Sequence, residues 1–319
     1  MVVAIFSYLT LITPVEQRTL HLTMVEGSIG LGVLIGVSLN GVIIDDLGLD
    51  TLTYITVLIA IPPLLIAILF VRNATRARRS PSTTHQICSQ VLSLQSVTDA
   101  FSTITKKRKG FKRCLLSLTF VLYFFPLSGE ETFESVSFLY FVKELGFTMT
   151  EYSVFNAGKI SIICFGGPLV IILVKRFLNP DDLTFALGSC AVTATAFIIM
   201  SQPEITGSIW FGGIFLITQV PFSALVKTIQ TKLCEEDELG KLFAFVAIMQ
   251  SVISTVFGVV GKLFYTTSLS VWPSSFIAFT ALMYVAAMII ICIMSYVHDR
   301  HVRICLLAET NEVEKLATG

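Results

Sequence analysis

Apolar runs of about twenty residues recur along the whole of this 319-residue chain. A helix of about twenty residues is long enough to cross the ~30 Å hydrocarbon core of a bilayer. Charged residues make up 14% of the sequence, whereas soluble domains contain about 25%. A polar group inside a bilayer must be hydrogen-bonded within the protein, and helices satisfy their own backbone. The sequence therefore predicts an all-α membrane protein.

Hydropathy divides the chain into about eight complete spans and one partial span. The expected boundaries are 1–12 for the partial span and 20–44, 51–71, 114–142, 151–174, 183–201, 208–226, 242–265 and 273–297 for the complete ones. The first run is too short to span and lacks the charged flank of a signal peptide. We therefore expect the chain to be the later portion of a longer protein.

The distribution of Lys and Arg predicts the orientation. With residues 72–113 in the cytoplasm, all of the 22 basic residues except Lys143, Lys159 and Lys262 lie on the inner side, as the positive-inside rule requires. The predicted domains are a remnant of an N-terminal helical bundle (1–71), a cytoplasmic linker loop (72–113), a C-terminal six-helix bundle (114–297) and a cytoplasmic tail (298–319).

The sequence carries no motif of an enzyme, a nucleotide-binding loop or a metal site. Its seven cysteines form no CxxC pair, and its formal net charge is zero. We therefore predict that the protein is not an enzyme, binds no metal or cofactor and has no nucleic-acid partner. Its chemistry must come from polar residues within the spans, where ionisable groups are costly and mark function.

Glu26 is the clearest of these residues. It follows Arg18 by eight residues, roughly 12 Å along its helix. Burial disfavours a charged carboxyl, so Glu26 is a candidate proton carrier. The alternative is a glutamate hydrogen-bonded between helices without proton traffic. The same helix repeats small residues at intervals of four, Ser28, Gly32 and Gly36, a spacing typical of close helix packing.

The stretch "PLSGEETFESVSFLYF" places three glutamates inside a predicted span. Glu130 and Glu134 share a helix face, while Glu131 points about 100° away. The preceding Pro126 and Gly129 favour a kink or a break. These carboxyls either line a cavity or meet water where the helix tilts or ends early. The sequence leaves both possibilities open.

Lys159 lies about nine residues into the next span, at a depth similar to that of Glu130. A buried lysine needs a partner, and the three glutamates are its nearest candidates. The pair is either a structural salt bridge or part of a pathway for a substrate or a proton.

Further polar candidates lie in the later spans. Gln219 precedes a kink that is expected at Pro221, and Lys227 either extends to the membrane interface or faces the cavity. Gln250 occupies a span that is loosely similar to the one containing Glu26. We include Gln219, Lys227 and Gln250 among the residues that can line a substrate cavity.

Three stretches carry a resemblance to a known family: "VEQRTLHLTMVEGSIGLGVLIG", "VPFSALVKTIQTKLCEEDELGKLFA" and "YTTSLSVWPSSFIAFTALMY". With these stretches the chain resembles the major facilitator superfamily and, within it, the proton-coupled folate transporter and thymic stromal cotransporter family. The resemblance covers essentially the whole chain, aligned to spans four through twelve. It implies two helical bundles around a central cavity that opens alternately to each side, with the first bundle incomplete.

The resemblance also implies roles for individual residues. Glu26 falls on the intramembrane glutamate used for proton coupling, and Lys227 falls on or beside a cavity arginine. Glu130 and Glu131 resemble the acidic step after the seventh-span glycine. The seventh-span histidine of the folate transporter has no counterpart here, which argues against folate as the substrate.

The predicted function is therefore proton-coupled symport of an organic anion or small polar solute by alternating access. Its partners are the proton, that solute and the lipid of the plasma or lysosomal membrane. The alternatives are a non-transporting membrane receptor or regulatory protein, and an inactive truncated transporter.

Overall fold

The computed structural model of the chain describes residues 6, 9–10, 13–14, 17–76, 112–202, 207–235 and 238–318. These residues form helices, and no strand occurs among them. The prediction of an all-α protein is therefore confirmed. The chain divides into two compact units, one of Met1–Leu31 with Ala100–Gly319 and the other of Gly32–Asp99. The division into bundles, loop and tail made from the sequence stays a prediction.

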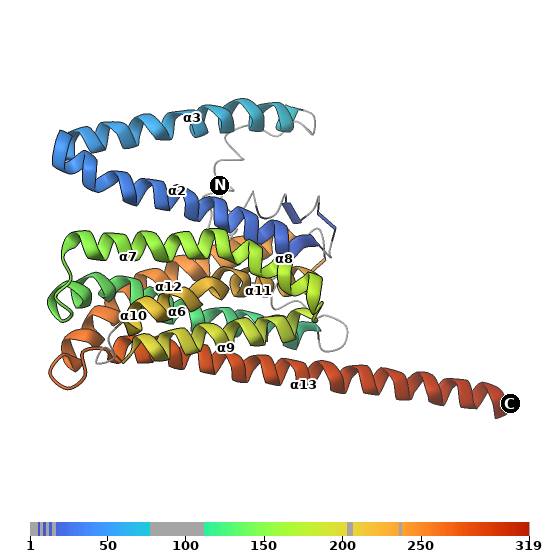
Figure 1. The fold of residues 1–319 in the computed structure, drawn as a ribbon. Coiled ribbons are helices and arrows are strands. Elements are labelled where there is room, and N and C mark those ends of the chain that lie inside the picture. The colour runs from blue at the N-terminus through green and yellow to red at the C-terminus, as the bar shows by residue number, and fades with distance from the viewer. Residues whose placement is uncertain are drawn as a thin grey trace. The chain divides into compact units, whose positions relative to one another are not determined.

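Each complete span predicted from hydropathy has a helix at its place. The helices are α2 (Arg18–Leu47), α3 (Leu49–Arg76), α6 (Lys112–Lys143), α7 (Met149–Ser161), α8 (Gly167–Phe177), α9 (Asp182–Met200), α10 (Ser208–Phe215), α11 (Gln219–Leu233), α12 (Leu239–Ser268) and α13 (Ser275–Thr318). In Figure 1, α6 to α13 lie alongside one another as a bundle in the larger unit.

Six helical stretches in the described part of the chain are long and apolar enough to cross a membrane. They are Arg18–Gly36, Thr150–Phe177, Asp182–Met200, Ser208–Leu233, Leu239–Ser268 and Ser275–Val297. The helix α6 is long enough but is not among them, because its glutamates lower the hydropathy of its C-terminal half.

Of the kink or break predicted near Pro126, the break is wrong, because α6 continues through this residue without interruption, and the kink stays a prediction. The nearby Gly129 is instead a position of close helix packing, since a Cβ atom there would lie 3.1 Å from the Cα atom of Thr280. The Thr280 hydroxyl also donates to the Gly129 carbonyl at 2.9 Å. Gly129 therefore lets α13 cross close to α6, while proline is tolerated in a membrane helix that its neighbours support.

Two of the spans are irregular near their middle. A π-helical segment, Ile162–Gly166, joins α7 to α8, and a 3-10 segment, Leu216–Thr218, joins α10 to α11. Pro221 lies in the first turn of α11, where its missing N–H is not needed. The kink predicted at Pro221 itself stays a prediction, and the irregularity in the structure is the 3-10 segment before α11. The two segments meet where a Cβ atom at Gly166 would collide with the Ile217 side chain.

Fully buried aromatic rings form the core of the larger unit. The Phe133 and Phe197 rings lie 5.3 Å apart, and Phe197 stacks on Tyr284 at 5.8 Å. These rings bring α6, α9 and α13 together directly beside the glutamates of α6. The aromatic core therefore fixes which way those carboxyls can point.

Hydrogen-bonded caps fix the starts of two helices. Thr148 and Glu151 form a reciprocal capping box at the start of α7. Asp181 caps α9, accepting from the Thr184 hydroxyl at 2.6 Å and from its N–H at 3.1 Å. These bonds, first of all the one from the Thr184 side chain, hold the pKa of Asp181 below its usual value.

The two segments predicted to lie in the cytoplasm are described in part. The tail 298–319 is the continuation of α13, which stays helical to Thr318 and extends past the other helices of its unit (Figure 1). Of the loop 72–113, α3 takes the beginning and α6 the end, and residues 77–111 lie outside the described residues.

Gly212 gives a first test of the packing. A Cβ atom at this position would lie 2.8 Å from the carbonyl oxygen of Ala196, so α10 would have to move away from α9. We expect Gly212→Ala to lower the free energy of unfolding by about 1–3 kcal/mol. The matched control is Gly188→Ala, because an added Cβ there meets no described atom within 4 Å. Thermal unfolding in detergent distinguishes them, and equal stability of both variants would contradict this packing.

Candidate functional site

A buried ion pair links α2 to α11. The ammonium of Lys227 donates to the Oε1 atom of Glu26, and the Ser223 hydroxyl donates to the same oxygen at 3.2 Å. The side chains of Lys227 and Glu26 are 7% and 12% exposed. The sequence singled out both residues but did not pair them. Lys227 does not extend to the interface, since it finds a carboxylate at its own depth.

Aromatic rings surround the same ammonium. The Nζ atom of Lys227 lies 4.7 Å from the centroid of the Phe6 ring and 5.8 Å from that of Tyr123. The Tyr123 side chain also hydrogen-bonds to Lys227. Electron-rich ring faces attract a cation, most strongly where water is excluded. Lys227 therefore keeps favourable contacts even when Glu26 carries no charge.

A second group of polar side chains lies between α6, α7 and the start of α11. Lys159 donates to the Oε1 atom of Glu134 at 2.5 Å, and Lys159 is 7% exposed while Glu134 is 52% exposed. The residues around the narrow adjoining pocket are Glu130, Phe133, Glu134, Lys159, Phe197, Leu216 and Gln219. The structure thus brings together four of the residues predicted to line a cavity.

The other two carboxyls of α6 point to different helices. The Tyr284 hydroxyl of α13 donates to Glu130, and the Ser254 hydroxyl of α12 donates to Glu131 at 2.9 Å. Glu130 lines the pocket together with Glu134, whereas Glu131 does not. The predicted separation of the two helix faces is therefore confirmed.

Tyr123 stands between the two groups. This side chain of α6 is 6% exposed, and the charges of Glu26, Lys227 and Glu130 all act on its hydroxyl. Tyr123 therefore lies within electrostatic range of both groups, because interactions between charges are strong where water is excluded.

A family model described as Major Facilitator Superfamily matches residues 1–235, well over half of the chain. The chain belongs to the major facilitator superfamily. No individual curated protein matches it. As a member of this superfamily it is a multi-pass integral membrane protein that transports a small solute, and its apolar helices agree with that assignment.

The remaining predicted residues of this superfamily member lie apart from both groups. Gln250 is exposed on α12, and Ser28 is exposed on α2, where its hydroxyl donates to the carbonyl of Met24. A Cβ atom at Gly32 or Gly36 would meet no described atom within 4 Å. The packing role of Ser28, Gly32 and Gly36 stays a prediction.

Two other glycines of α2 do contact a neighbouring helix. A Cβ atom at Gly27 would lie 3.2 Å from the carbonyl oxygen of Cys164, and one at Gly30 would collide with the Cys164 thiol. Cys164 lies in the π-helical segment between α7 and α8. Close packing on α2 therefore belongs to this pair, on a different side of the helix from the residues that the sequence suggested.

Sequence reasoning missed several partners of these groups. Ser223 precedes Lys227 by four residues and so shares its helix face, a signal that was available. Tyr284 is the only hydroxyl-bearing residue in the run "ALMYVAAMII", which is a weaker signal. Nothing in the sequence indicated that the ring of Phe6 would be a partner, because its contact with Lys227 exists only in the folded chain.

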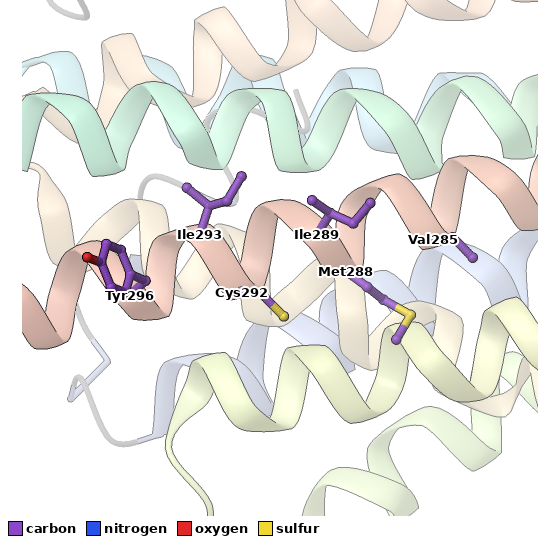
Figure 2. Close-up of a pocket in the computed structure, with 6 residues that line it drawn as sticks. All are labelled: Val285, Met288, Ile289, Cys292, Ile293 and Tyr296. Atoms are coloured by element: carbon purple, nitrogen blue, oxygen red, sulfur yellow. The ribbon is translucent and has the colours of Figure 1, made fainter.

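A metal centre and an apolar groove are two further kinds of site that a membrane transporter can contain. The described residues hold no group of three or more His, Cys, Asp or Glu side chains placed to bind a metal ion. A groove of about 580 Å³ runs along α13 (Figure 2), lined by Val285, Met288, Ile289, Cys292, Ile293 and Tyr296. Its walls carry no charged side chain, so it offers nothing to hold a polar solute, and its apolar surface suits lipid.

Proposed function

We propose that this transporter is a proton-coupled symporter that moves an organic anion, or a similar small polar solute, toward the cytoplasm. The observation that carries the proposal is the buried ion pair between Glu26 and Lys227. In the predicted domain division, Glu26 belongs to the N-terminal bundle and Lys227 to the C-terminal bundle. A contact between the two bundles has to change whenever they move against each other.

The ion pair supplies a simple coupling mechanism. While Glu26 is ionised, it occupies the ammonium of Lys227. A proton on Glu26 removes that charge and leaves Lys227 available to the carboxylate of a solute. Proton binding and anion binding therefore favour each other, and such linkage is reciprocal. An acidic outer compartment then drives the anion inward.

Within the superfamily we assign the chain to the proton-coupled folate transporter and thymic stromal cotransporter family. The sequence stretches around Glu26 and Lys227 support this assignment. A lysine keeps the charge of the family's cavity arginine but lacks its bidentate fork, which argues for an anion other than folate. We place the protein in the plasma or lysosomal membrane, with residues 72–113 and 298–319 in the cytoplasm, on the basis of the positive-inside rule.

Uptake by the purified chain in liposomes tests the proposal. A panel of labelled mono- and dicarboxylates is offered with the outside acidic, and internal pH is followed with a trapped dye. We expect at least one anion to accumulate together with protons. Glu26→Gln should abolish the dependence of uptake on pH, because its amide cannot take up the proton. Glu144→Gln, at an exposed carboxyl beyond the end of α6, is the matched control and should behave as wild type.

Two results would contradict the proposal in different ways. Binding of an anion without flux would favour a non-transporting receptor or an inactive transporter. Uptake whose pH dependence survives in Glu26→Gln would remove Glu26 from the coupling while leaving transport intact.

A further inference from the structure

The carboxyls of α6 outnumber the cations that face them. Glu130, Glu131 and Glu134 lie within about one turn of helix, and Lys159 is the one base among the residues that line their pocket. Lys159 is taken by Glu134 at 2.5 Å, and Glu131 turns to the Ser254 hydroxyl. Among the residues that the structure describes, Glu130 therefore has no positively charged hydrogen-bonding partner.

The hydrogen-bonding partners of Glu130 are neutral, and the walls of its pocket are largely apolar. Its hydrogen-bonding partners are the hydroxyl of Tyr284, which is 0% exposed, and the amide of Gln219. The walls of the pocket are the side chains of Phe133, Phe197 and Leu216. A carboxylate without a counter-ion is unfavourable in such surroundings. A group in this position avoids the cost by taking up a proton.

We propose that Glu130 is a second proton-binding site of this protein, separate from Glu26, which holds its proton inside the C-terminal bundle against the Tyr284 hydroxyl. The ligand is the proton itself. The pocket is narrow and already filled by its own side chains, which excludes a larger ligand but not a proton. This inference does not depend on the proposed role of Glu26.

The other titratable groups around Glu130 do not supply the missing charge. They come from α6 itself, α7, α9 and α13, while α11 contributes the neutral Gln219. The groups are Tyr123, Glu131, Glu134, Lys159, Cys190 and Tyr284. Lys159 is the only cation in this set and is paired with Glu134, so a proton on Glu130 removes a charge that no cation of the set offsets.

The proton on Glu130 also controls the contact between α6 and α7. Glu130 and Glu134 are separated by one helical turn and line the same pocket as Lys159. While Glu130 is neutral, Lys159 stays with Glu134. Once the proton leaves, two carboxylates compete for Lys159 and the ion pair with Glu134 weakens. Proton release is thereby linked to a rearrangement at this end of the pocket.

Infrared spectroscopy of the full chain in lipid nanodiscs tests the proposal without a known solute. A protonated carboxyl absorbs separately from a carboxylate, so at pH 7 the wild type should show a carboxylic acid band. Glu130→Gln should lose this band. The matched control is Glu131→Gln, which changes the adjacent carboxyl on the other helix face and should retain it. Glu26→Gln should retain it as well, because this change leaves Glu130 and its hydrogen-bonding partners in place.

Tyr284→Phe supplies a second readout if Glu130→Gln does not fold. Removing the phenol hydroxyl should shift the acid band to higher frequency, since a hydrogen bond to the carbonyl oxygen is lost. A wild type without the band, a band that persists in Glu130→Gln, or a band that does not move in Tyr284→Phe would overturn the proposal. Glu130 would then be an anion stabilised by Tyr284 and Gln219. None of these outcomes bears on the uptake test of Glu26.

Discussion

Lys227→Ala is expected to lower the free energy of unfolding by about 3–5 kcal/mol, the usual cost of removing one partner of a buried ion pair. The variant leaves the Glu26 carboxylate, which is 12% exposed, with the Ser223 hydroxyl as its remaining donor. It also removes the stacking of the ammonium on Phe6. Because the stranded carboxylate can be neutralised by a proton, the loss of stability should be smaller at acid pH than at alkaline pH.

A double variant shows whether Lys227→Ala is unstable because the Glu26 charge is unpaired or because the packing of the lysine side chain is lost. Glu26→Gln combined with Lys227→Met replaces both charges by neutral side chains of similar length, and such replacements are often close to neutral in stability. We expect it to recover most of the stability lost in Lys227→Ala when thermal unfolding is measured in detergent. A double variant that is as unstable as the single one, at every pH, would show that the ion pair is not the cause.

The ion pair between Glu134 and Lys159 should respond asymmetrically to mutation. Lys159 is 7% exposed but Glu134 is 52% exposed. Glu134→Gln strands a buried ammonium and should cost about 1–3 kcal/mol of unfolding free energy. Lys159→Met instead leaves a carboxylate that water can reach, and it should cost less than about 1 kcal/mol. Thermal unfolding of the two variants, measured side by side, shows which of them loses more stability.

The difference in stability between Glu134→Gln and Lys159→Met tests whether Lys159 is buried while Glu134 is exposed to water. A symmetric salt bridge at the surface would give two small and equal effects. If Lys159→Met were the more damaging variant, then Lys159 would contribute mainly through its packing over Phe133, whose ring centroid lies 5.5 Å from the Nζ atom.

The sequence by itself determined the helices and the placement of their charges. A run of about twenty apolar residues can satisfy its backbone in a bilayer in essentially one way, so α9, α12 and α13 follow from composition. The turn of 100° per residue likewise placed Glu130 and Glu134 on one face and Glu131 on another. These are local properties, and local geometry needs no knowledge of the neighbouring helices.

Only the tertiary structure decided which charges meet. Lys227 and Glu26 are 201 residues apart in the chain, and Tyr284 and Glu130 are 154 apart. Nothing in either segment states how its helix is rotated against the others. That rotation, set by the packing of aromatic side chains and of glycines such as Gly30, kept Lys227 inside the protein, although the length of its side chain allowed it to reach the interface. A side chain's partner is a property of the packed bundle, because it depends on contacts between helices that are distant in the sequence.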